Sequence, residues 1–205
     1  MKKNPTTNIN IMNFVDQVNL QNYYWYKEGF NKEELQKIYD GVAKLPFNEA
    51  TVFGNSEVET IKNIRSSSVK WIPKNDEWMW LYEKLMDMAS TANNEVWKFN
   101  LISAQELIQY TEYYDTNGGH YDWHQDIGPG IGSQRKVSIT VQLSEPHEYE
   151  GGDLEMWSGG ENVSVAERGA GVVFIFPSYM MHRVTKVTKG TRRSFVLWVG
   201  GDHYR

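Results

Sequence analysis

The chain of 205 residues contains no cysteine. Disulfide bonds are therefore excluded, and so are a zinc site built on thiolates and a cysteine nucleophile. Any metal site in this protein must use nitrogen and oxygen ligands.

The sequence also lacks a long apolar run. Its first segment, MKKNPTTNINIMNF, has two lysines but not the apolar centre of a signal peptide, and no stretch approaches the roughly 18 apolar residues of a membrane span. We therefore expect a cytoplasmic protein without a membrane segment.

Basic residues are fewer than acidic ones. The sequence has 21 Lys and Arg and 26 Asp and Glu, which gives a formal net charge of −5. This balance disfavours nucleic acid as a partner held by a broad basic surface. The length suits a single domain over 1–205, and eight tryptophans supply bulky packing. We expect about 1–100 to form a helical support and about 101–205 to form a core of short strands that carries the chemistry.

The most informative motif is HYDWHQD, which contains His124 and Asp126. Residues two apart on an extended segment point to the same side, so both can grip one ion. His182 follows 58 residues later and would have to arrive on another strand. Two histidines and one carboxylate form the facial triad that binds Fe(II) and leaves positions open for other ligands. An isolated H-x-D also occurs by chance, and a lone histidine is more often a hydrogen-bonded residue than a ligand.

An arginine pair, Arg192 and Arg193, follows Gly190 on the chain that enters the apolar run FVLWVG. A guanidinium offers a rigid fork of donors that matches a carboxylate with two bonds, which suits a buried dicarboxylate cosubstrate. The alternative is an ordinary surface ion pair. The choice between the two arginines stays open at this point.

Five blocks in order carry a family resemblance. They are Tyr114 and Tyr121 ahead of HQD, RKVSITVQLS at 135–144, YEGGDLEMW at 149–157, GVVFIFPS at 171–178 and HRVTKVTKGTR at 182–192. Over roughly 105–200 the chain resembles the 2-oxoglutarate- and Fe(II)-dependent dioxygenase superfamily, on its prolyl 4-hydroxylase-like branch and close to bacterial PKHD-type hydroxylases. Lys186 departs from the proline that such chains usually carry in H-R-V-x-P-V, which leaves the substrate side open.

The resemblance implies an α+β fold in which a double-stranded β-helix, or jelly roll, of about eight strands is flanked by N-terminal helices. It also implies an enzyme that uses Fe(II), 2-oxoglutarate and O2, with ascorbate as a candidate reductant. Such an enzyme hydroxylates an unactivated C–H bond and releases succinate and CO2. A prolyl or other side chain of a peptide or protein is the favoured substrate, and a free amino acid is a further candidate.

Carried over to this sequence, the resemblance assigns metal binding to His124, Asp126 and His182. It assigns the distal carboxylate of 2-oxoglutarate to Arg192 rather than Arg193, because the family's arginine stands two positions after glycine. Tyr114 matches a tyrosine whose hydroxyl contacts the cosubstrate. The candidate walls of the substrate cleft are aromatic residues that could equally be packing: Tyr121, Trp123 and Trp157.

Two other functions remain as alternatives. The first is oxidative demethylation of nucleobases by the same iron chemistry, which the acidic balance and the missing R-x-x-x-x-x-R pattern after His182 disfavour. The second is a non-catalytic, cupin-like metal-binding module, which would have no need for the dicarboxylate anchor Arg192. The oligomeric state is not readable from the sequence.

Local patterns predict the elements around this site. Asn31 and Glu34 suit a capping box at the start of one helix, and Asp76 is a plausible N-cap for a second helix. In RKVSITVQLS apolar residues alternate with polar ones, as in a strand whose polar face either lines the cosubstrate pocket or faces solvent. The segment 51–70 reads as extended, either a surface loop or a lid.

Overall fold

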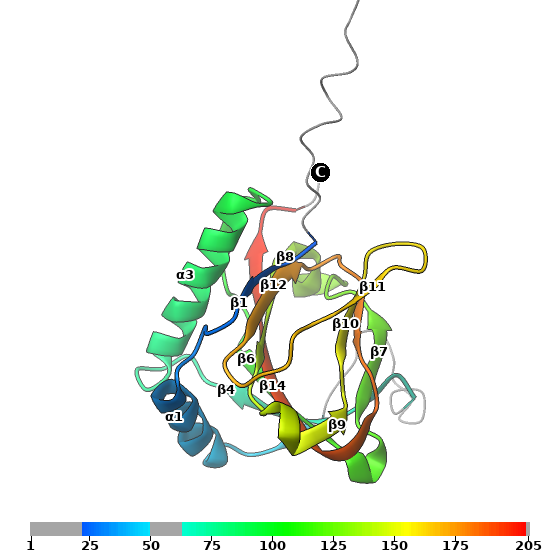
Figure 1. Cartoon of the computed structure of the whole chain (residues 1–205). Coiled ribbons are helices and arrows are strands. Elements are labelled where there is room, and N and C mark those ends of the chain that lie inside the picture. The colour runs from blue at the N-terminus through cyan, green and yellow to red at the C-terminus, as the bar shows by residue number, and fades with distance from the viewer. Residues whose placement is uncertain (1–21, 50–62, 204–205) are drawn as a thin grey trace, which may run out of the picture.

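The computed structural model describes residues 22–49 and 63–203 (Figure 1). Its helices are α1 (Lys32–Ala43), α3 (Met79–Glu95) and the short 3-10 turns η2 (Asp115–Asn117), η3 (Gly130–Gln134) and η4 (Pro146–Glu148). Its strands are β1 (Tyr24–Tyr26), β2 (Asn48–Glu49), β3 (Arg65–Ser66), β4 (Ser68–Ile72), β5 (Leu101–Ser103), β6 (Ile108–Tyr114), β7 (His120–His124), β8 (Arg135–Gln142), β9 (Tyr149–Gly151), β10 (Leu154–Trp157), β11 (Val163–Val165), β12 (Val173–Pro177), β13 (His182–Val184) and β14 (Val187–Gly201).

Helix α1 begins as the sequence predicts. The Asn31 side chain accepts a hydrogen bond from the Glu34 N–H, and the Glu34 carboxylate accepts one from the Asn31 N–H, each at 2.9 Å. This reciprocal capping box satisfies two amide donors that the first helical turn leaves free. Leu35, Ile38 and Val42 then follow at helical spacing and are buried.

The start of α3 differs from the expectation that Asp76 is its N-cap. The helix begins at Met79, and its N-cap, Trp78, makes no side-chain capping bond. The Trp78 N–H is instead bonded to the Asn75 carbonyl and lies 3.3 Å from the Asn75 side-chain oxygen. The helix therefore starts after Asp76, and its N-cap is the buried Trp78 rather than this polar residue.

The strands form two antiparallel sheets. The larger sheet runs β1-β12-β8-β14-β6-β4-β2, with β5 and β9 paired to β14, and the smaller sheet runs β11-β10-β13-β7-β3. Figure 1 shows α1 and α3 on one side of the larger sheet and β7, β10 and β11 on its other side. One cavity is lined by residues of both sheets, so it lies between them.

The alternation along β8 separates two kinds of environment. Val137, Ile139 and Val141 lie in the apolar cluster shared with α1 and α3. Their polar neighbours are also buried, and Thr140 lines the cavity between the sheets. The polar face of RKVSITVQLS therefore faces the cavity and not the solvent.

The first hundred residues supply strands as well as helices. Strand β1 pairs with β12, β3 pairs with β7, and β4 pairs with β6. The expected division into a helical support and a strand core is therefore incomplete, because this part of the chain extends both sheets. Of the segment read as a loop or lid, 51–62 lies outside the described residues, whereas the rest contributes β3 and β4. Within the described ranges, no helix is long and apolar enough to cross a membrane.

The backbone conformation at Gly190, two residues before Arg192, requires a glycine. Gly190 has φ +75, and a Cβ built there would lie 2.1 Å from the Glu148 carbonyl oxygen. We expect Gly190→Ala to lower the thermal unfolding temperature by more than about 5 °C, because left-handed strain of roughly 1–3 kcal/mol adds to the clash. Gly118→Ala is the matched control, since its φ is +58 but no atom lies within 4 Å of its Cβ. An equal loss in both variants would contradict this account.

Candidate metal centre

The three sequence-predicted ligands lie together, although they come from separate segments. His124 and His182 are paired opposite one another on the adjacent strands β7 and β13. Asp126 follows two residues after the end of β7, and its N–H donates to the Ser178 carbonyl at 2.9 Å. The aspartate is therefore placed by a loop that the β12–β13 turn holds, whereas the sequence predicted a continuous strand.

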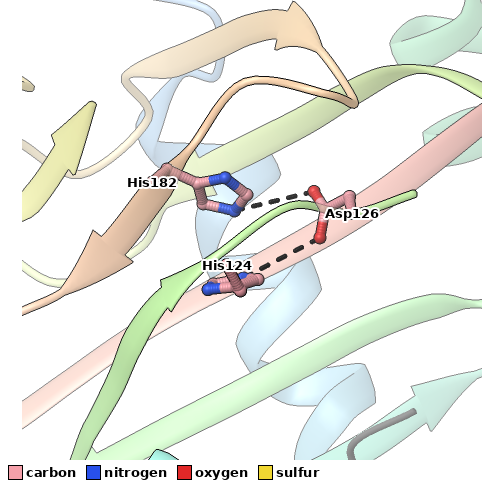
Figure 2. Close-up of side chains that lie close together, drawn as sticks. All are labelled: His124, Asp126 and His182. Carbon is pink, nitrogen blue, oxygen red and sulfur yellow. Dashed lines mark ion pairs between the residues drawn. The ribbon is translucent and has the colours of Figure 1, made fainter. Parts of the chain in front are cut away.

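The side chains point toward a common centre, as Figure 2 shows. The Nε2 atoms of His124 and His182 lie 3.9 Å and 3.6 Å from the two Asp126 carboxylate oxygens. One ligand atom from each residue can be chosen so that all lie within 4.8 Å of one another. Two imidazole nitrogens and one carboxylate oxygen are the donor set of a facial triad for Fe(II). The donor chemistry and spacing therefore fit that metal.

Both histidines are oriented for metal binding by their other ring nitrogen. Nδ1 of His124 lies 2.7 Å from the Asp122 carbonyl, and Nδ1 of His182 lies 2.9 Å from the Met180 carbonyl. A carbonyl only accepts, so each Nδ1 carries the proton and each Nε2 keeps a free lone pair. The lone pairs thus face the position that a metal would take.

The charges also suit a metal. Burial lowers the pKa of His124 to about 3, and the adjacent His182 acts in the same direction. Burial raises the pKa of Asp126, but the two histidines, the Ser138 hydroxyl and Arg135 outweigh it, so this pKa lies below its ordinary value. At neutral pH His124 is therefore neutral and Asp126 is ionised, which are the forms that bind metal ions.

Two residues that the sequence did not single out hold Asp126. The Ser138 hydroxyl donates to its Oδ2 at 2.6 Å, and Arg135 Nη1 donates to its backbone carbonyl at 2.8 Å. Arg135 is itself paired with Glu106 and lies over the Trp198 ring, 3.8 Å from its centre. The alternation in RKVSITVQLS predicted that Ser138 lies on the polar face of a strand. Alternation alone does not predict which residues that face contacts.

We expect Ser138→Ala to weaken metal binding by about 10–100-fold, which is the usual cost of losing a partner that orients a ligand. Ser144→Ala is the control, because Ser144 is as buried but bonds the backbone at Thr191 and Arg193. Anaerobic titration with Fe(II) measures both variants. Equal affinities in Ser138→Ala and the wild type would show that the hydroxyl does not orient Asp126.

The cavity beside the triad has a volume of about 310 Å³. Arg192 is 1% exposed and lines this cavity, with Nη1 donating to Ser194 Oγ at 2.9 Å and Nη2 donating to Gln142 Oε1 at 2.7 Å. Its Nε has no hydrogen-bond partner within the described residues, and its two partners there, Ser194 and Gln142, are both uncharged. A buried cation with a free donor fits a carboxylate ligand such as 2-oxoglutarate.

Arg193 is placed differently, because neighbours on a strand point to opposite faces. It pairs with Glu112 and Glu148 and does not line the cavity. The geometry therefore favours Arg192 over its neighbour as the residue that faces a cosubstrate.

The structure places the Tyr114 side chain outside the cavity. Its hydroxyl donates to Glu112, and its side chain is not part of the cavity wall. Tyr113 lines the cavity instead, with the Arg192 guanidinium 5.3 Å from its ring centre. On β6, the side chains of Gln109, Thr111 and Tyr113 point into the cavity.

Of the three candidate cleft residues, only Tyr121 lines the cavity. Its ring stacks on His124 with the ring centres 3.5 Å apart. A β-bulge explains this, since Asp122 and Trp123 together face a single residue, Arg183, so that both Tyr121 and His124 point inward. Trp123 contacts Arg183, and Trp157 is 43% exposed with its indole N–H bonded to Gly160. Neither tryptophan belongs to the cavity wall.

Residues 108–200 match the family model of the 2OG-Fe(II) oxygenase superfamily. A PKHD-type hydroxylase of Rippkaea orientalis is 29% identical over 179 residues, which are 84% of this chain and 75% of that protein. A PKHD-type hydroxylase of Acidovorax ebreus is 37% identical over 97 residues, or 44% of this chain. Over residues 108–200 the chain is similar to the 2OG-Fe(II) oxygenase superfamily, and the relatives it matches are PKHD-type hydroxylases. The chain spans three quarters of the first relative's length but only 41% of the second's.

The fold agrees with this similarity. The solved structure of a prolyl hydroxylase from Trichoplax adhaerens, in complex with a peptide fragment of hypoxia inducible factor, matches with a TM-score of 0.73 at 16% identity. The match covers 90% of this chain and 86% of that one. The expected double-stranded β-helix with flanking helices is confirmed. The family's requirement for Fe(II), 2-oxoglutarate and O2 is consistent with the triad, and the non-catalytic cupin-like alternative is set aside.

Proposed function

We propose that this oxygenase hydroxylates an unactivated C–H bond in a prolyl or other side chain of a peptide or protein, with 2-oxoglutarate as cosubstrate. The observation that carries the proposal is the content of one cavity. It holds two histidines and a carboxylate around a common centre, and it also holds a buried arginine without an acidic partner. Neither feature alone would require both a metal and a dicarboxylate.

Each residue has a distinct task in this proposal. His124, Asp126 and His182 hold Fe(II), and Arg192 binds the distal carboxylate of 2-oxoglutarate with its orientation fixed by Gln142 and Ser194. With O2, the bound iron and cosubstrate supply the oxidising chemistry that converts 2-oxoglutarate to succinate and CO2 while one oxygen atom enters the substrate. The chain's part is to place these partners together in one cavity.

A peptide substrate is supported by the relatives. The Trichoplax prolyl hydroxylase binds a peptide, and the curated relatives are named PKHD-type hydroxylases. In this chain the Tyr121 ring, stacked on His124, offers an aromatic wall beside the metal position. Such a wall suits an apolar ring or alkyl side chain.

The proposal is tested with proline-containing peptides and a library of other sequences, given with Fe(II), 2-oxoglutarate, ascorbate and air. We expect succinate formation and a peptide that gains the mass of one oxygen atom, with both lost when 2-oxoglutarate is omitted. Methylated oligonucleotides serve as the comparison. Demethylation of these oligonucleotides without oxidation of any peptide would overturn the proposal in favour of the nucleobase alternative.

A further inference from the structure

A second buried arginine, Arg65, lines the same cavity. It lies on β3, outside the segment that matches the family model, and is 6% exposed. It is directly opposite Tyr121 across the β3–β7 pair, and its guanidinium lies 4.7 Å from the centre of that ring. Because the same ring stacks on His124, Arg65 is close to the metal position.

The guanidinium of Arg65 is held in place but not neutralised. Nε donates to Ser67 Oγ and Nη2 donates to Gln109 Oε1, both at 2.8 Å. Both acceptors are uncharged, and Nη1 has no protein acceptor within the described ranges. No carboxylate in those ranges pairs with Arg65, whereas the third arginine of the cavity, Arg135, is paired with Glu106 at 2.5 Å. Within the described ranges, Arg65 therefore brings a positive charge without an acidic partner to the cavity.

The proposed iron and cosubstrate do not compensate this charge. Divalent iron and Arg192 together contribute three positive charges. Asp126 and the two carboxylates of 2-oxoglutarate contribute three negative ones, and imidazoles bind a metal in their neutral form. The site is thus balanced without Arg65, and Arg135 is balanced by Glu106. A buried charge is costly unless it is paired, so a further anion is expected beside Arg65 when the cavity holds its ligands.

We propose that Arg65 binds a carboxylate of the substrate that is hydroxylated. The inference rests on the proposed function and deepens it, because it specifies that the substrate carries an acidic group near its target carbon. The fork of Arg65 is pre-oriented by Ser67 and Gln109 and by the Tyr121 ring, which is the arrangement that favours a carboxylate over a neutral group. Arg65 is in these terms a specificity-determining residue.

The test measures binding without turnover. Protein is loaded anaerobically with Mn(II) and saturating 2-oxoglutarate, and its thermal unfolding is followed during titration with acetate and N-acetyl-L-proline. The matching amides, acetamide and N-acetyl-L-prolinamide, are titrated in parallel. We expect at least one carboxylate to raise the unfolding temperature saturably and its amide to have no effect. In Arg65→Met the apparent affinity for that carboxylate should fall at least about tenfold, and Arg65→Lys should retain part of it.

Arg168→Met is the matched control. Arg168 also lies 4.7 Å from the centre of a tyrosine ring, that of Tyr149, but it pairs with Asp153 and does not line the cavity. This variant should keep the carboxylate response. A wild-type protein that 2-oxoglutarate stabilises but carboxylates do not, or an unchanged response in Arg65→Met, would overturn the assignment alone. Absence of any Mn(II)-dependent stabilisation by 2-oxoglutarate would instead contradict the proposed function and, with it, this inference.

Discussion

Replacing Asp126 with alanine is expected to weaken Fe(II) binding by more than about 100-fold, because loss of a mere orienting partner already costs about 10–100-fold. Asp126 is the anionic member of the triad, and each of its two oxygens faces one histidine Nε2, at 3.9 Å for His124 and 3.6 Å for His182. The variant should also lose Fe(II)-dependent succinate formation. The measurement is anaerobic Fe(II) titration, with circular dichroism to show that the fold is retained.

Asp122→Ala is the matched control for this substitution. Asp122 is exposed and only two residues before His124, and its carbonyl, which the alanine variant keeps, accepts the His124 Nδ1 proton. Its carboxylate bonds the Trp123 N–H and not the metal centre. We expect a change in Fe(II) affinity of less than about threefold. If Asp126→Ala bound iron as tightly as Asp122→Ala, the triad assignment would be wrong.

The second large effect is expected for Arg192→Met, which should weaken 2-oxoglutarate binding by at least about 30-fold. Loss of one partner from a buried charge pair costs roughly 2–5 kcal/mol, and each 1.4 kcal/mol is tenfold in affinity. Fe(II) affinity should change little, because Arg192 contacts Gln142 and Ser194 rather than the triad. Calorimetric titration of 2-oxoglutarate into Mn(II)-loaded protein gives this affinity.

Arg193→Met is the control that distinguishes loss of the proposed 2-oxoglutarate anchor from general effects of removing an arginine. Arg193 is next in sequence but pairs with Glu112 and Glu148 on the other side of the sheet. This variant should bind 2-oxoglutarate within about threefold of the wild type, although its stability should fall. Arg192→Lys should bind with intermediate affinity, because it keeps the charge and loses the planar fork. Wild-type affinity in Arg192→Met would show that another residue anchors the cosubstrate.

The triad could be predicted from the sequence because metal binding restricts the residue types at a position more strongly than folding does. Two histidines and an aspartate are a limited donor set, and the H-x-D spacing already placed His124 and Asp126 near one another. The meeting of His124 with His182 required the family resemblance, since nothing local reports that β7 and β13 pair.

Which other residues line the cavity could not be predicted, because strand phase depends on features that sequence periodicity does not reveal. Tyr113 and Tyr114 are the same residue type on adjacent positions, so composition gives no reason to prefer one face of β6 for either. The bulge opposite Arg183 brings Tyr121 to the same side as His124, against simple alternation, while Trp123 points away. Arg65 was read within a loop segment, and only its pairing with β7 places it in the cavity.

The central claim is that the cavity between the two sheets is a 2-oxoglutarate oxygenase centre. It is tested most directly by succinate formation from 2-oxoglutarate in anaerobically purified protein that is then given Fe(II), air and the peptide library. The wild type is compared with His182→Ala. We predict Fe(II)-dependent succinate in the wild type and none above background in the variant. Equal succinate formation by both proteins, or none by a wild type that also binds neither Fe(II) nor 2-oxoglutarate, would contradict the claim.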